Sequence, residues 1–418
     1  MTDVEPLRAL HYDPAAVGDL SKVTAPPYDV IDERQRAELL ARSPFNVVAI
    51  DLPVGGEDRY EAAREQFESW QLQGILVRDP EPALWAYVQD YVGPDGERRQ
   101  RRGFFCRVRI EGYGPGGVRP HERTHPGPKE DRLQLTRATR ANISPIFSLY
   151  SDTQQAAWAA LEPATHESPW AEVTDADGTT HRVWRVTDPG AIAAVQAATR
   201  DAELLIADGH HRYETMDAYV QELGGEGEHR YILMCLVALE DPGLTVFPTH
   251  RVVRDLDEAR WEALAAALER DFEITDVPVD EIAPSDPSGP LQMGYIDSRE
   301  GRAKRLRLRD QAIADAALAG HSEAYRRLDT AVLEALVLKG ALGLSDDDIS
   351  HFQGMFYARD ADEAIEMVRS GNYQAAFVMR PTPISQVREI AAAGENMPPK
   401  STYFFPKLLT GLLFNPLS

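Results

Sequence analysis

Helix-like and strand-like segments alternate along the whole of this 418-residue chain, and the alternation limits the fold to a mixed α/β architecture. Apolar residues recur at helical spacing over residues 32–42 and 58–74. Residues 84–91 and 102–111 predict two strands joined by a turn, because glycine and proline interrupt the pattern between them. Residues 46–52 predict a further strand. The length is enough for two or three domains.

Two segments rich in loop-forming residues divide the chain. Glycine and proline crowd residues 112–128, which predicts a long exposed loop. Proline, aspartate and serine crowd residues 277–290, which predicts a linker. We therefore expect an N-terminal α/β region over residues 1–111, a core with an insertion over 112–276, and a C-terminal α/β region over 277–418.

The charge balance and the cysteines narrow the class of protein. The chain has 44 Lys+Arg against 67 Asp+Glu, a formal charge of −23, which argues against a nucleic-acid partner. Cys106 and Cys235 lie in apolar, strand-like surroundings and are expected to be core residues. The longest apolar run, 231–239, is far shorter than the ~20 residues of a membrane span. We expect a soluble cytoplasmic protein with no membrane partner and leave its oligomeric state open.

The densest chemistry lies where an apolar strand over 203–207 runs through a tight turn into a helix over 212–223. Free N–H groups at the start of a helix, together with its dipole, attract anions. Asp208, Gly209, His210, His211 and Arg212 follow one another at that place, and arginine is suited to bidentate phosphate contacts. The turn therefore predicts a phosphate site. The alternative is that Asp208 only caps the helix and the histidines pack or face water.

The segment 208–212 resembles the phosphate-binding motif of the ParB/sulfiredoxin superfamily, most closely that of its free serine kinases. The whole chain also resembles the bacterial and archaeal domain-of-unknown-function family 1015. The stretches that carry this second resemblance are residues 25–31, 121–124, 207–214, 248–251 and 397–411.

The resemblance implies a ParB/sulfiredoxin-like nucleotide-binding core with additional N- and C-terminal α/β regions. It also implies a kinase that moves a phosphoryl group from ATP or ADP, with Mg²⁺, to the hydroxyl of free L-serine, and so forms O-phosphoserine. Its partners would be a nucleotide and a small hydroxy amino acid. Carried onto this chain, the roles are nucleotide binding for Gly209, His210, His211 and Arg212, catalysis for Glu122 and Asp208, Mg²⁺ binding for Asp208, and substrate binding for His121, Thr249, His250 and Arg251.

Other interpretations of these residues stay open. A nucleotide-binding switch of the ParB partition type, or a nucleotide hydrolase, would use the same phosphate motif. His121, Glu122 and His125 also match the H-E-x-x-H zinc-protease pattern, but that pattern needs a helix, and the prolines on both sides argue against one. Glu122 is otherwise an exposed loop residue. Lys400 and Lys407 are expected either to close over an anionic ligand or to lie on the surface.

Overall fold

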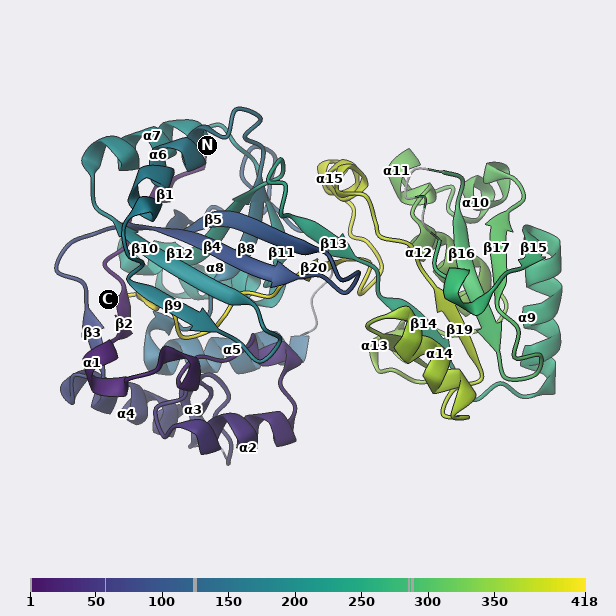
Figure 1. Cartoon of the computed structure of the whole chain (residues 1–418), viewed down its shortest axis with the longest axis horizontal. Helices are drawn as coiled ribbons and strands as arrows, with labels where there is room; N and C mark the ends of the chain where they lie inside the picture. The colour runs from purple at the N-terminus through teal and green to yellow at the C-terminus, as the bar shows by residue number, and fades with distance from the viewer. Residues whose placement is uncertain (1, 57, 123–125, 285, 287–288) are drawn as a thin grey trace. The chain divides into compact units, whose positions relative to one another are not determined.

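The computed structural model describes residues 2–56, 58–122, 126–284, 286 and 289–418, and of 126–128 only the backbone. The chain forms two compact units, each described here by itself (Figure 1). The first unit comprises the described residues of 1–120, 124–244 and 406–418. The second comprises His121, Glu122 and the described residues of 245–405. The chain therefore leaves the first unit and returns to it for its last residues.

A nine-stranded mixed sheet forms the centre of the first unit, in the order β6-β11-β8-β12-β5-β4-β10-β9 with β1 beside β5. The pairs β11/β6 and β12/β8 are parallel, and the other pairs are antiparallel. The strands are β1 (Val4–Glu5), β4 (Leu84–Val92), β5 (Arg98–Arg109), β6 (Val118–Arg119), β8 (Ile146–Tyr150), β9 (Ala171–Thr174), β10 (Thr180–Val186), β11 (Leu204–Asp208) and β12 (Tyr231–Ala238).

Helices and two small strand pairs complete the first unit (Figure 1). The helices are α1 (Pro14–Val17), α2 (Glu33–Arg42), α3 (Val48–Asp51), α4 (Arg59–Leu72), α5 (Pro126–Thr139), α6 (Ala156–Leu161), α7 (Pro189–Thr199) and α8 (His210–Leu223). Strand β2 (Leu10–Tyr12) pairs with β3 (Leu76–Arg78), and β7 (Ala141–Asn142) pairs with β21 (Asn415–Pro416). Cys106 and Cys235 are buried free thiols, which confirms the prediction that they are core residues.

The second unit is built on a six-stranded antiparallel sheet in the order β15-β17-β16-β19-β14-β18. Its strands are β13 (Thr245–Phe247), β14 (His250–Val253), β15 (Phe272–Asp276), β16 (Gln292–Asp297), β17 (Lys304–Leu308), β18 (Met355–Ala358), β19 (Ala375–Val378) and β20 (Tyr403–Phe405), of which β13 pairs with β20. Its helices are α9 (Glu258–Asp271), α10 (Gln311–Ala317), α11 (Glu323–Arg326), α12 (Asp329–Leu333), α13 (Asp346–Ser350), α14 (Ala361–Arg369) and α15 (Ile384–Ala392).

These elements confirm the mixed α/β class and most of the predicted segments, with two corrections. The predicted strand over 46–52 is wrong, because the chain forms the helical turn α3 there. Asn46 explains the change: its side chain accepts from the backbone N–H of Val48 and donates to the carbonyls of Lys22 and Thr24. The predicted long loop over 112–128 contains β6 and the first turn of α5. The three-region division stays a prediction.

Candidate functional site

The strand-to-helix turn lies inside the first unit, between β11 and α8. Strand β11 is buried from Leu204 to Ala207 and lies between β6 and β8 in the sheet, with Leu204 and Ile206 in the hydrophobic core. Gly209 is the N-cap of α8 and has no side chain with which to cap it. The Asp208 carboxylate accepts from Arg212 and Lys407.

Gly209 is required at this turn for two independent reasons. Its φ is +103°, in the region that side chains with a Cβ rarely adopt. A Cβ at this position would also lie 3.0 Å from Nε of Arg212, closer than side chains normally pack. The absence of a side chain therefore lets the Arg212 guanidinium fold back over the turn.

The Asp208 carboxylate is held between two cations. Arg212 Nη2 donates to Asp208 Oδ2 at 2.6 Å, and Lys407 Nζ donates to Asp208 Oδ1 at 2.6 Å. The three side chains are between 11% and 20% exposed, so water screens these charges only partly. Two positive charges and one negative charge leave the group with a net positive charge.

The other motif residues surround this group. His210 is buried at the first position of α8, and His211 is half-buried beside it. Arg212 also donates from Nη1 to the carbonyl of Pro145. Its Nε is buried and has no hydrogen-bond partner among the described residues. Two nitrogens of the guanidinium group, Nη1 and Nη2, are therefore engaged by the protein, and Nε keeps an unused N–H donor.

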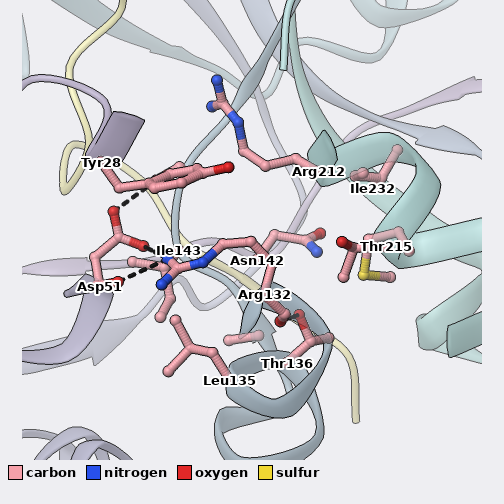
Figure 2. Close-up of a pocket in the computed structure, with 13 residues that line it drawn as sticks. Tyr28, Asp51, Arg132, Leu135, Thr136, Asn142, Ile143, Arg212, Thr215 and Ile232 are labelled. Carbon is pink, nitrogen blue, oxygen red and sulfur yellow. Dashed lines mark hydrogen bonds and ion pairs between the residues drawn. The ribbon is translucent and has the colours of Figure 1, made fainter. Parts of the chain in front are cut away.

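A small pocket with a mixed polar and apolar lining lies beside Arg212 (Figure 2). It encloses about 40 Å³, and its polar lining includes Tyr28, Asp51, Arg132, Ser144 and Arg212. At ~10–15 Å³ for each water, that is room for about three water molecules. Its charged and polar lining residues can contact a small polar group.

A buried ion pair between Arg132 and Asp51 forms part of the pocket wall. Arg132 Nη1 donates to the backbone carbonyl of Asp51 at 2.7 Å and to its carboxylate at 3.1 Å. The Arg132 guanidinium also lies 4.3 Å from the ring centre of Tyr28. Burial raises the pKa of Asp51, although Arg132 and Arg212 oppose the shift. Burial likewise raises the pKa of Tyr28 to about 12, so its hydroxyl stays protonated at neutral pH.

Sequence reasoning did not select Asp51, and it left both Arg132 and Lys407 open between an anion-binding role and a surface position. Arg132 lies on α5, just after the predicted loop over 112–128, and Asp51 lies on α3, where a strand was predicted. Lys407 is 199 positions from Asp208 in sequence. The available signal for Lys407 was its basic side chain in a proline- and aromatic-rich segment of an acidic chain.

The predicted catalytic base and substrate-binding residues belong to the second unit. His121 is buried, and its Nε2 lies 3.0 Å from Oγ1 of Thr402. Glu122 is half-buried and pairs through its backbone with Met397. The H-E-x-x-H pattern has no helix at its first two residues, and His125 lies outside the described residues.

Residues 249–251 of the same unit have mainly buried side chains. The carbonyl of Thr249 accepts from Arg251 Nη1, and Arg251 Nη2 donates to the carbonyls of Pro399 at 3.0 Å and Lys400 at 3.1 Å. Burial lowers the pKa of Arg251, while the charges of Tyr357, Glu334 and Glu122 act in the opposite direction. His250 is buried in β14, where its Nδ1 accepts from the Met379 N–H at 3.0 Å. Substrate binding by His121, Thr249, His250 and Arg251 stays a prediction.

The described residues do not build a magnesium site. Mg²⁺ prefers oxygen ligands, commonly carboxylates. Across the described part of the chain, no three His, Cys, Asp or Glu side chains gather in a metal-binding group. Both carboxylate oxygens of Asp208 already accept from a cation. Metal binding by Asp208 therefore stays a prediction, and we derive no chemical step through the ion.

The fold and the site together define a mixed α/β protein whose strand-to-helix turn gathers one carboxylate and two cations. The chain belongs to the family described as "Protein of unknown function (DUF1015)", whose model matches residues 4–331. No curated protein matches the chain in sequence. Within the described residues, no helix combines the length and apolar character needed to cross a membrane.

Three solved structures share part of the arrangement at low similarity. A variant of free serine kinase in complex with AMP is 14% identical, with a TM-score of 0.39, and the match covers 74% of this chain and 92% of that one. A conserved hypothetical protein from Pyrococcus furiosus is 14% identical, with a TM-score of 0.37 and coverages of 74% and 95%. A C-terminally truncated SbnI from Staphylococcus aureus is 12% identical, with a TM-score of 0.37 and coverages of 75% and 87%. Similarity this weak carries no functional argument.

Proposed function

We propose that this protein is a nucleotide-dependent phosphotransferase that phosphorylates the hydroxyl of free L-serine. The observation that carries the proposal is the turn at 208–212, where Asp208 lies between Arg212 and Lys407 at the start of α8. A net positive group at the N-terminus of a helix is suited to bind phosphate. The motif at this turn also resembles that of the free serine kinases.

Phosphoryl transfer depends mainly on positioning and on neutralising charge, which are the properties this turn offers. In the proposal, Gly209, His210, His211 and Arg212 hold the phosphates of ATP or ADP, and Asp208 keeps the cations in place. A Mg²⁺ ion at this turn would be held by Asp208 and would neutralise part of the phosphate charge. The serine hydroxyl oxygen forms a bond to the terminal phosphorus, the bond from that phosphorus to the bridging oxygen breaks, and the shortened nucleotide leaves.

The hydroxyl proton needs an acceptor, and the proposal gives this role to Glu122. A carboxylate can act as a general base when it lies within hydrogen-bond reach of the hydroxyl. His121, Thr249, His250 and Arg251 would then contact the amino acid. Glu122 belongs to the second unit and Asp208 to the first.

The test measures nucleotide turnover with and without L-serine and identifies the phosphorylated product by mass. We expect O-phosphoserine to form only when serine is present. Glu122→Gln and Asp208→Asn should each lower its rate of formation by at least about a hundredfold, the size typical for loss of a general base. The control is Glu172→Gln, because Glu172 is an exposed carboxylate on strand β9.

The same assay separates the alternatives. If the protein binds nucleotide but phosphorylates no hydroxy amino acid, the kinase proposal is wrong and a nucleotide-binding switch explains the site better. Nucleotide turnover that needs no acceptor would identify a hydrolase. Specific retardation of DNA at physiological salt would support a partition-type protein.

A further inference from the structure

Lys407 lies at the point where the chain re-enters the first unit, two residues after strand β20 ends. Its ammonium group contacts one oxygen of Asp208 while Arg212 contacts the other. Lysine is uncommon in this chain. Of the 44 Lys+Arg residues, six are lysines, at positions 22, 129, 304, 339, 400 and 407. Most cationic side chains of this chain are therefore arginines, whereas the cation at position 407 is the compact ammonium group of a lysine.

The backbone around Lys407 is held by two buried side chains. Arg101 Nη2 donates to the carbonyl of Pro406 at 2.6 Å, and Gln89 Nε2 donates to the carbonyl of Lys407 at 3.1 Å. Gln89 and Arg101 face each other across β4 and β5, and Arg101 Nε donates to Gln89 Oε1 at 2.9 Å. This pair therefore fixes the start of the C-terminal segment on the central sheet.

Placing Arg101 there has an energetic cost. Its side chain is 1% exposed and lies 4.4 Å from the ring centre of Phe147. A guanidinium group removed from water loses favourable solvation, and burial lowers the pKa of Arg101. An apolar pair of similar size would hold two strands together without that loss. Arg101 and Gln89, unlike an apolar pair, donate hydrogen bonds that hold the backbone at Pro406 and Lys407 in place.

We propose that Lys407 is a phosphate-binding residue that, with Arg212, holds the diphosphate part of the nucleotide, and that Arg101 and Gln89 position it. This inference rests on the proposed function, because it concerns the same site. A diphosphate carries more negative charge than the single Asp208 carboxylate, so it competes effectively for two cations that Asp208 shares in the free protein. Lysine binds phosphate as a point charge and adjusts its ammonium group without a fixed planar geometry.

The test is isothermal titration of the full-length protein with pyrophosphate and with ADP, in buffer that contains a chelator. Lys407→Met and Lys407→Gln should each weaken binding of both ligands by at least about tenfold, the loss expected for one charge-assisted contact. Lys407→Gln keeps a donor for Asp208, so it tests the charge even if Lys407→Met folds poorly. Lys304→Met is the control, because Lys304 is paired and equally enclosed but lies on β17.

Each outcome decides between the two proposals. If wild-type protein binds neither ligand, or if both Lys407 variants bind them as tightly as wild type, the phosphate-binding role of Lys407 is wrong. If binding depends on Lys407 but no O-phosphoserine forms, Lys407 keeps its role and the serine kinase proposal fails. If O-phosphoserine forms and the Lys407 variants bind pyrophosphate and ADP as tightly as wild type, the serine kinase proposal is supported and the role of Lys407 is wrong.

Discussion

Arg212 is the residue that joins the two polar features of the first unit. One side of its guanidinium group faces Asp208, and its side chain also lines the small pocket with Tyr28 and Arg132. A ligand that moves Arg212 therefore affects both the carboxylate and the pocket. Gly209 gives Arg212 this freedom, because any larger residue would occupy the same space.

The requirement for Gly209 can be tested with two glycines of the same helix. Gly209→Ala places a methyl group 3.0 Å from Arg212 and forces a residue with a Cβ to adopt a φ of +103°. We expect it to lower the free energy of unfolding by about 1–3 kcal/mol and to abolish pyrophosphate binding. Calorimetry and chemical denaturation measure the two effects.

Gly224→Ala is the matched control for that variant. Gly224 ends α8 with a φ of +62°, and a Cβ there meets no atom within 4 Å. It should lose a comparable amount of stability while pyrophosphate binds as in wild type. Equal loss of binding in both variants would mean that helix stability, and not the contact with Arg212, controls the site.

At the scale of elements, β14 holds an imidazole that must stay neutral. His250 is buried with Nδ1 accepting a backbone N–H, and protonation would remove that acceptor. Burial, aided by the charge of Arg251 and opposed by Asp360, lowers the pKa of His250 from 6.5 to about 4. The unfolded chain therefore binds more protons than the folded chain between these values, so this group favours folding above pH 6.5 and loses that effect as pH falls toward 4.

This shift predicts a measurable pH dependence. For pKa values of 6.5 in the unfolded chain and about 4 in the folded protein, the titration of His250 lowers the free energy of unfolding at pH 5 by about 2 kcal/mol. The stability advantage of wild type over His250→Gln should therefore shrink by about that amount between pH 7.5 and pH 5. Urea denaturation of both proteins at each pH measures the advantage. A constant difference across this range would show that His250 titrates normally in the folded protein.

The helices and turns of the structure show how far local sequence patterns predict individual elements. The turn between β11 and α8 was correctly predicted, because an apolar strand, a glycine and a helical repeat follow one another within a few residues. Helix α3 was missed because its conformation is determined by Asn46, whose amide donates to carbonyls more than 20 positions away. Helix α5 was missed because the prolines at residues 126 and 128 indicated a loop, although proline is tolerated in the first turn of a helix.

At the scale of the whole molecule, the C-terminal segment completes the first unit. Thr410 exchanges two backbone hydrogen bonds with Ala25, Phe414 bonds to Leu10, and β21 pairs with β7. Phe414 is fully buried and its ring packs near Tyr12 and Phe67. No local pattern could place these contacts, because they join the two ends of the chain.

This closure predicts that one C-terminal side chain carries much of the stability of the first unit. Phe414→Ala should lower the free energy of unfolding by about 3–5 kcal/mol, because it leaves a cavity among buried rings. Leu72→Ala should change it by less than about 0.5 kcal/mol, since that side chain is 90% exposed. Thermal unfolding compares the two variants. A small loss for Phe414→Ala would mean that the C-terminal segment packs less tightly than these contacts indicate.

The return of the chain to its first unit also sets an order of events during protein synthesis. Asp208 and Arg212 leave the ribosome 199 and 195 residues before Lys407, respectively, because position 407 follows 208 and 212 by those distances. At roughly 5–20 residues per second, the second cation reaches Asp208 some 10–40 s later. A nascent or prematurely terminated chain therefore lacks the complete charged turn. Only a chain translated past residue 407 carries it.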